Sequence, residues 1–267
     1  MRFAGLRKIV WIAGAMSACG VCFAATGKAG ENQVDLELVI TVDVSRPMDR
    51  DEATVARSGY IEAFRNPAVV EAIKKGTLGR IAVTFVEWSD PDTQKVVVPW
   101  MMVDGSASAN DFADRLSQAP LQWLRSTSIS GALLFSAGLI EKSGFSAPRR
   151  AIDVSGNGPN NAGGPVVAAR AAVVARGITI NGLPIDLGPR EAVIANLSDY
   201  YNECVIGGPE AFLYPVTEVS QLPLAIRRKL IQEIAAAEPA QSRMITTVQA
   251  TAVDCMIGEK LSGGAAQ

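Results

Sequence analysis

The alternation of strand-like and helix-like segments constrains the fold of this chain more than any other feature. Residues 34–45, "VDLELVITVDVS", form an apolar, β-branched run that is typical of a buried strand. Similar runs lie at residues 80–89, 94–103, 178–185 and 211–216, and one at 149–161 ends in a Gly- and Asn-rich turn. Helical patterns separate them. This alternation predicts βαβ units in an α/β fold: a doubly wound, mostly parallel sheet with helices on both faces, Rossmann-like.

The helices expected between these strands are short, and Pro99 places one strand at the sheet edge. A proline cannot donate to a central ladder, so we expect the strand at 94–103 to be an edge strand. The predicted helices lie at residues 49–64, 67–76, 109–118, 127–144, 165–177, 191–203 and 223–237. Residues 245–253 are a further candidate strand.

Composition narrows the class of function. The chain has 267 residues, which suggests one ordinary domain with extensions, or at most two small ones. With 48% hydrophobic residues it can build a core, and its net charge of −2 gives no broad basic surface for nucleic acid. It contains no histidine, which excludes His-based catalysis and imidazole metal ligands.

The N-terminus has the pattern of a signal peptide over residues 1–24, followed by a polar linker at 25–33. Basic residues precede an apolar run that is shorter than the roughly 20 residues of a spanning helix, and Cys22 and Ala24 suit a cut after Ala24. An uncleaved anchor and a lipoprotein box at "MSAC" are the alternatives. All three place the remaining chain outside the cytoplasm, in the periplasm or secreted, and cleavage leaves no membrane span.

Two cysteines, Cys204 and Cys255, remain after that cleavage. Two cysteines in an oxidising compartment allow one disulfide, so we predict that they pair.

Oxygen-bearing side chains gather in three turns that follow predicted strands or precede a helix. The first turn offers Asp43, Ser45 and Asp49, the second Thr127, and the third Asn157. In parallel sheets, sites lie beyond the carboxyl ends of the strands. Hydroxyls, carboxylates and amides suit a hard cation such as Mg²⁺.

Each of these residues also has a purely structural interpretation. Asp43 and Ser45 can cap the turn after their strand, and Thr127 can be a helix N-cap. Asp153 lies inside an apolar strand, so it is either a buried, hydrogen-bonded structural acid or a site residue.

In these turns the chain resembles the von Willebrand factor A-like domain. That family has a strand ending in Asp-x-Ser-x-Ser, a later Thr and a later Asp, which together hold one divalent cation in a metal-ion-dependent adhesion site. The matching residues here are Asp43, Ser45, Pro47, Thr127 and Asn157. The segments "GRIAVTFVEWSD", "IDVSGNGPNN", "GITINGLPI", "YYNECVIGGPEAF" and "AIRRKLIQEIA" resemble a group of uncharacterised exported bacterial proteins of that superfamily.

Two of the five positions depart from the family pattern. Pro47 has no side-chain oxygen where the family has Ser, and Asn157 has no charge where the family has Asp. The resemblance therefore implies a degenerate site, in which Mg²⁺ or another divalent cation binds weakly or not at all. Asp49 or Glu87 could compensate for the lost charge.

The resemblance implies an exported, non-catalytic protein-binding module, whose unknown protein partner lies in the envelope or outside the cell. It covers residues 34–237 and leaves residues 238–267 as a C-terminal extension. The alternatives are a metal-assisted hydrolase that uses the same turns, and a structural remnant without metal. The hydrolase lacks support from sequence motifs, since neither Ser-x-x-Lys nor Gly-x-Ser-x-Gly occurs.

Overall fold

The chain divides into two units, Met1–Glu31 and Asn32–Gln267, and the described helices and strands belong to the second. The computed structural model describes residues 1, 30, 32–45, 50–120, 126–186, 193–235 and 253–264. The predicted signal peptide, Pro47, Asp49 and the candidate strand at 245–253 thus lie outside the described residues, apart from Met1 and Val253.

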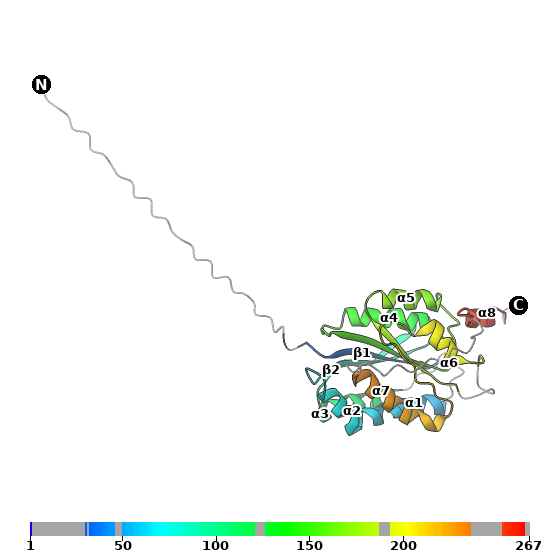
Figure 1. The fold of residues 1–267 in the computed structure, drawn as a ribbon, viewed down its shortest axis with the longest axis horizontal. Coiled ribbons are helices and arrows are strands. Elements are labelled where there is room, and N and C mark those ends of the chain that lie inside the picture. Colours follow the sequence, from blue (N-terminus) through cyan, green and yellow to red (C-terminus); the bar gives the residue numbers. More distant parts are fainter. Residues whose placement is uncertain are drawn as a thin grey trace. The chain divides into compact units, whose positions relative to one another are not determined.

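A five-stranded sheet in the order β3-β2-β1-β4-β5 forms the centre of the second unit (Figure 1). The strands are β1 (Leu36–Asp43), β2 (Ile81–Trp88), β3 (Gln94–Val103), β4 (Arg149–Gly156) and β5 (Thr179–Pro184). β1 pairs in parallel with both β2 and β4, and β5 pairs in parallel with β4. β3 is antiparallel to β2 and lies at the edge. The predicted doubly wound, mostly parallel sheet and the edge position of the Pro99 strand are both confirmed.

Helices cover both faces of this sheet, which explains why β1 is a continuous apolar run rather than an alternating one (Figure 1). Leu38 and Ile40 face α1, α2, α3 and α7, whereas Val39 faces α4, α5 and η1. The main helices are α1 (Arg50–Arg65), α2 (Pro67–Lys74), α3 (Ser106–Gln118), α4 (Ile129–Glu141), α5 (Val166–Val174) and α7 (Leu222–Ala235). The shorter ones are α6 (Leu197–Tyr200), the π-helix η1 (Tyr201–Val205), the 3₁₀ helix η2 (Val219–Gln221) and α8 (Ile257–Gly264).

Three predicted elements differ from the structure. The strand predicted at 211–216 is not regular: it runs beside β5 and makes only isolated bridges, because Pro184 of β5 has no N–H to donate between the bonds that Gly182 and Asp186 donate. In place of the helix predicted at 191–203, the structure has the shorter α6 followed by η1. Helix α3 begins three residues earlier than predicted. The Ser108 hydroxyl accepts from the backbone N–H of Gly105 (3.2 Å) and so caps the start of α3. The helix α8 was not predicted.

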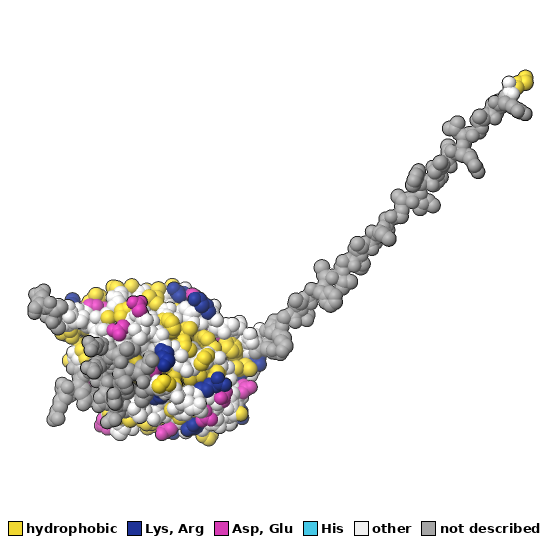
Figure 2. Space-filling model, turned by 180° about the vertical axis from the view of Figure 1, so that it is seen from behind, with side chains coloured by type: hydrophobic (Ala, Val, Ile, Leu, Met, Phe, Trp, Pro, Cys, Tyr) yellow, Lys and Arg dark blue, Asp and Glu magenta, His cyan; other side chains and the backbone are white. Residues whose placement is uncertain are grey.

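Among the described residues, we find no helix whose length and hydropathy would make it a candidate membrane span. On the face shown in Figure 2, basic, acidic and hydrophobic side chains of the described residues are interspersed, and no single charge dominates it.

Candidate functional site

The carboxyl ends of β1 and β4 bring the predicted oxygen-bearing residues to the same edge of the sheet. Asp43 is the last residue of β1, Asn157 directly follows β4, and Thr127 lies just before α4. Asp43, Ser45 and Thr127 are buried, and the exposed fraction of Asn157 is 9%. We call these four residues the strand-end cluster.

Hydrogen bonds join three members of the cluster. The backbone N–H of Ser45 donates to Asp43 Oδ1 (2.8 Å), which turns the chain at the end of β1. The hydroxyls of Ser45 and Thr127 are 2.8 Å apart and form a hydrogen bond across 82 residues of sequence. The cluster is thus assembled by the fold and is more than a local turn.

Two buried oxygens of the cluster have no hydrogen-bond partner among the described residues. These are Asp43 Oδ2 and Asn157 Oδ1. A buried acceptor without a partner costs about 1–3 kcal/mol, so such atoms are usually paired with water, an ion or a ligand. They mark the point where the cluster can bind something.

Tyr201, on η1, adds a third such atom, and no sequence motif marks this residue. Its buried hydroxyl also lacks a partner among the described residues. A Cβ on Gly156 would lie 2.7 Å from the Tyr201 hydroxyl and 3.2 Å from Asp43 Oδ2. Glycine at this position therefore leaves room for both groups. Burial and the charge of Asp43 raise the pKa of Tyr201, so its hydroxyl remains a donor.

The "GNGPNN" turn after β4 supports the cluster from one side. Asn161 Oδ1 accepts from the backbone N–H of Thr127 (2.9 Å), and Asn161 N–H donates to the Thr127 carbonyl (2.9 Å). Asn160 Oδ1 accepts from the backbone N–H of Ser130 at the start of α4 (2.9 Å). The turn thereby fixes the position of Thr127 relative to β4.

The C-terminal helix α8 packs against this same turn. Asn160 Nδ2 donates to Glu259 (2.7 Å), and the Ser262 hydroxyl donates to the Asn161 carbonyl (3.1 Å). Gly258 abuts the backbone of Asn160 so closely that a Cβ there would lie 2.1 Å from the Asn160 carbonyl oxygen.

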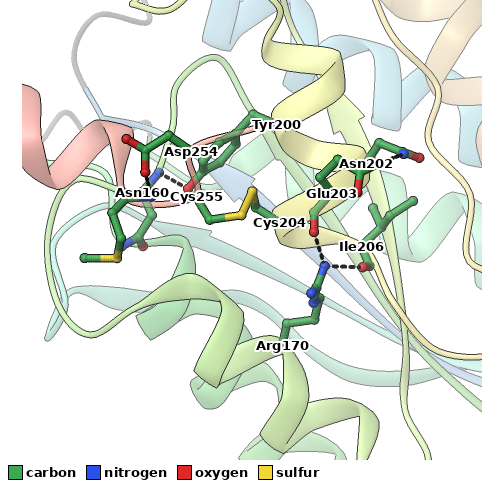
Figure 3. Close-up of a disulfide and its surroundings, with 10 residues drawn as sticks. Asn160, Arg170, Tyr200, Asn202, Glu203, Cys204, Ile206, Asp254 and Cys255 are labelled. Carbon is green, nitrogen blue, oxygen red and sulfur yellow. Dashed lines mark hydrogen bonds between the residues drawn. A yellow bond between two sulfur atoms is a disulfide. The ribbon is translucent and has the colours of Figure 1, made fainter. Parts of the chain in front are cut away.

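A disulfide holds the segment before α8 against η1. Cys204 and Cys255 are bonded, with their Cα atoms 5.5 Å apart, which confirms the predicted pair. Figure 3 shows this disulfide with Tyr200 on one side of it and Arg170 on the other. The Tyr200 hydroxyl accepts from the backbone N–H of Asn160 (3.1 Å). Arg170 donates to the carbonyls of Glu203 and Ile206.

Glu87, a candidate for supplying the missing charge, is engaged elsewhere. Its carboxylate is buried on β2 and forms an ion pair with Arg57 of α1. The other candidate, Asp49, and the departing residue Pro47 lie outside the described residues.

The spacing of the oxygen atoms in the strand-end cluster suits a cation, but the cluster carries little negative charge. The 2.8 Å between the Ser45 and Thr127 hydroxyls is close to the spacing of neighbouring oxygens around octahedral Mg²⁺. However, Asp43 is its one carboxylate, and burial raises the pKa of Asp43 to about 7. Among the described residues, no three Asp, Glu or Cys side chains are grouped to hold a metal ion. Among the described residues, the cluster thus offers a cation one carboxylate, two hydroxyls and one amide.

The described fold is similar to several solved structures. Proximal thread matrix protein 1 from the mussel byssus, with a zinc-occupied MIDAS motif, has 15% identity and a TM-score of 0.55 over 76% of this chain and 48% of that one. The vWF domain of the type V pili tip protein Mfa5 from Porphyromonas gingivalis has 9% identity and a TM-score of 0.55 over 79% and 98%. The pilus adhesin SpaC from Lactobacillus rhamnosus GG has 11% identity and a TM-score of 0.55 over 75% and 31%. At these identities the likeness shows the fold alone.

The described fold is that of a von Willebrand factor A-like domain. The chain belongs to the family described as "Protein of unknown function (DUF1194)", whose model matches residues 33–238. No curated protein matches it. The chain spans about half the length of the mussel byssus protein structures that it resembles.

Proposed function

We propose that this chain is an exported, non-catalytic protein-binding module that contacts its partner through the strand-end cluster. The observation that carries the proposal is the set of three buried polar atoms without partners among the described residues, on Asp43, Asn157 and Tyr201. They converge at the carboxyl edge of the sheet, where proteins of this architecture bind ligands. A matrix protein, a pilus tip protein and a pilus adhesin among the structural neighbours support a binding role.

Export is part of this proposal. The pair Cys204–Cys255 is typical of an oxidising compartment, and the sequence pattern of residues 1–24 is that of a signal peptide. We propose residues 25–33 as linker, 34–237 as the binding domain and 238–267 as an extension, part of which packs on the site.

Binding of the partner is tested by capture from the envelope fraction with the mature chain as bait. Asn157→Ala is the informative variant, because the Asn157 side-chain oxygen has no hydrogen-bond partner among the described residues and its removal costs the fold little. We expect the wild type to capture a partner protein that Asn157→Ala does not capture. Glu62→Gln, an exposed change on α1, is the control and retains it. Equal capture by all three proteins, or by none, would contradict a binding role for the cluster.

The melting temperature of the wild type is expected to be the same in millimolar Mg²⁺ and in chelator. The physical reason is that the cluster offers one carboxylate, Asp43, where the family's metal site has two, so less negative charge is available to hold a divalent cation. A ligand present at 100 times its dissociation constant would add about 2.7 kcal/mol and raise the melting temperature visibly. A large stabilisation by Mg²⁺ would show that the site is intact after all.

Restoring the two family residues tests the location of the site. The double variant Pro47→Ser/Asn157→Asp adds one hydroxyl and one carboxylate, and we expect it to gain a Mg²⁺-dependent rise in melting temperature. Asn157→Asp alone is the matched control for the added charge. If the double variant folds and does not respond to Mg²⁺, the cluster is not the equivalent of the family's metal site.

A further inference from the structure

A second group of charged residues is buried on the face of the sheet that packs against α1 and α7, away from the strand-end cluster. It consists of Lys229 and Glu233, one turn apart on α7, and Asp153 in the middle of β4. Their exposed fractions are 0%, 1% and 1%. Asp153 is therefore the buried acid that its apolar strand predicted. Fully buried lysines are rare, because removing the ammonium group from water is costly.

The lysine amine contacts both carboxylates. Lys229 Nζ forms an ion pair with Asp153 Oδ1 and lies 3.3 Å from Glu233 Oε2. The other oxygen of Glu233 accepts from Asn181 Nδ2 (2.8 Å), which fixes the carboxyl group beside the amine. The ring of Phe212 covers the amine, with its centroid 5.4 Å from Nζ.

The charges of this group balance only if one acid is protonated. Burial is the main cause that raises the pKa of Glu233, and the charge of Asp153 raises it further, while Lys229 opposes both. The raised pKa of Glu233 favours the form in which this acid carries a proton. An amine, a carboxylate and a protonated acid are then held together in an apolar setting.

We propose that Lys229 and Asp153 condense to an intramolecular isopeptide bond, with Glu233 as the acid and base that moves the protons. The reaction starts when a proton passes from Lys229 Nζ to the Asp153 carboxylate, which gives a neutral amine and a neutral acid. Nζ then attacks Cγ of Asp153. The Nζ–Cγ bond forms, a Cγ–O bond breaks, and one water molecule leaves.

Glu233 donates its proton to the departing oxygen, which leaves as water, and accepts a proton from Nζ in return, so it ends protonated as it began. The net change is ammonium plus carboxylate to amide plus water, and it needs no oxidant or other reactant. Two features of the site favour it. Groups held in contact react with effective concentrations of about 10⁵–10⁸ M, and a neutral amide replaces a buried ion pair that is costly to desolvate.

The site also has space into which the water can leave. A cavity of about 200 Å³ is lined by Asn181 and by Glu233 and Phe212, the last two of which lie beside the amine. The bond would fasten α7 to β4 across 76 residues of sequence, the difference between positions 229 and 153. It would lie on the α1–α7 face, whereas the disulfide lies on the other.

The intact mass of the purified wild-type chain tests this directly. We expect a mass lower by one water molecule than that of the reduced, uncondensed sequence, measured after denaturation and reduction. Trypsin cannot cut after a condensed Lys229, so digestion should yield a branched peptide that joins residues 151–170 to residues 229–243. If the chain has the uncondensed mass and residues 151–170 and 229–243 are found as two separate peptides, the proposal is wrong and the site is a buried ion pair only.

Glu233→Gln separates the proton-transfer role from mere packing. It keeps the size of the side chain and its contact with Asn181 but cannot accept a proton, so we expect the full, uncondensed mass. Glu62→Gln, an exposed glutamate on α1, is the matched control and should condense like the wild type. Condensation of Glu233→Gln at the wild-type rate would refute the role of Glu233. If this variant does not fold, the wild-type mass still decides whether the bond exists.

Discussion

Replacing Arg57 with methionine is expected to lower the free energy of unfolding by about 3–5 kcal/mol. The Arg57 guanidinium is buried, and it donates to the Glu87 carboxylate (Nε to Oε1, 3.0 Å) and to the carbonyls of Ala119 and Pro120. Methionine keeps the apolar stem but removes all of these bonds. The negative charge of Glu87 would then be buried without its cation. Urea denaturation monitored by circular dichroism gives the difference.

The chain offers a matched control on the same helix. Arg65 pairs with Asp114, but the two side chains are 47% and 55% exposed. Exposed pairs contribute about 0–1 kcal/mol, so Arg65→Met should change stability little. The double variant Arg57→Met/Glu87→Met should recover much of the loss, because it leaves no unpaired charge. A cost below 1 kcal/mol for Arg57→Met would mean that Glu87 finds another partner or takes up a proton.

The Arg57–Glu87 pair also bears on the strand-end cluster. The sequence left Glu87 as a candidate to replace the missing charge there, because it stands near the end of a strand beside β1. Side chains alternate along a strand, however, and Glu87 follows Phe85 onto the face that packs against α1. Its charge is used to balance Arg57, which leaves Asp43 as the one carboxylate of the cluster.

The parts of the fold that depend on local pattern could be predicted from the sequence. The apolar run ending at Asp43 and the edge strand with Pro99 lie where they were expected. The segment at 211–216 has a strand-like composition, but Pro184 on the neighbouring β5 cannot donate to it, and only isolated bridges form. Sequence patterns are reliable where one type of contact repeats, and less so where a single residue breaks the repeat.

The candidate site was predictable only in part, for a similar reason. Asp43, Ser45 and Thr127 belong to short motifs at element ends, so they could be recognised one turn at a time. Tyr201 could not, because its place beside Asp43 depends on the path of η1 over β4 and on the small size of Gly156. The buried group of Lys229, Glu233 and Asp153 was not predicted either, because only the packing of α7 on β4 brings the three side chains together.

Removal of the disulfide by the double variant Cys204→Ser/Cys255→Ser is expected to lower the free energy of unfolding by up to about 4 kcal/mol. That value is the loop-closure contribution for a sequence separation of 51 residues between the two cysteines. It is an upper limit, because α8 can detach while the sheet stays folded, and the sheet then unfolds at nearly its original stability. Denaturant unfolding with and without reductant measures the wild-type difference directly.

Loss of this tether should also loosen the turn beside the strand-end cluster. The disulfide keeps α8 next to Asn160 and Asn161, whose side chains in turn fix Thr127 and the start of α4. We therefore expect faster amide hydrogen exchange at residues 157–161 and at the start of α4 in the double variant, with little change at β1.

Gly258→Ala distinguishes the covalent tether from the packing that it supports. This variant keeps the disulfide but places a Cβ against the backbone of Asn160, so α8 must shift away from the turn. Gly263→Ala, on the same helix with open space around it, is the matched control. If contact with α8 holds the turn, Gly258→Ala raises exchange at residues 157–161 as the cysteine variant does, although its loop entropy is unchanged. If exchange rises only when the disulfide is absent, the covalent link through η1 fixes the turn and α8 contributes nothing to it.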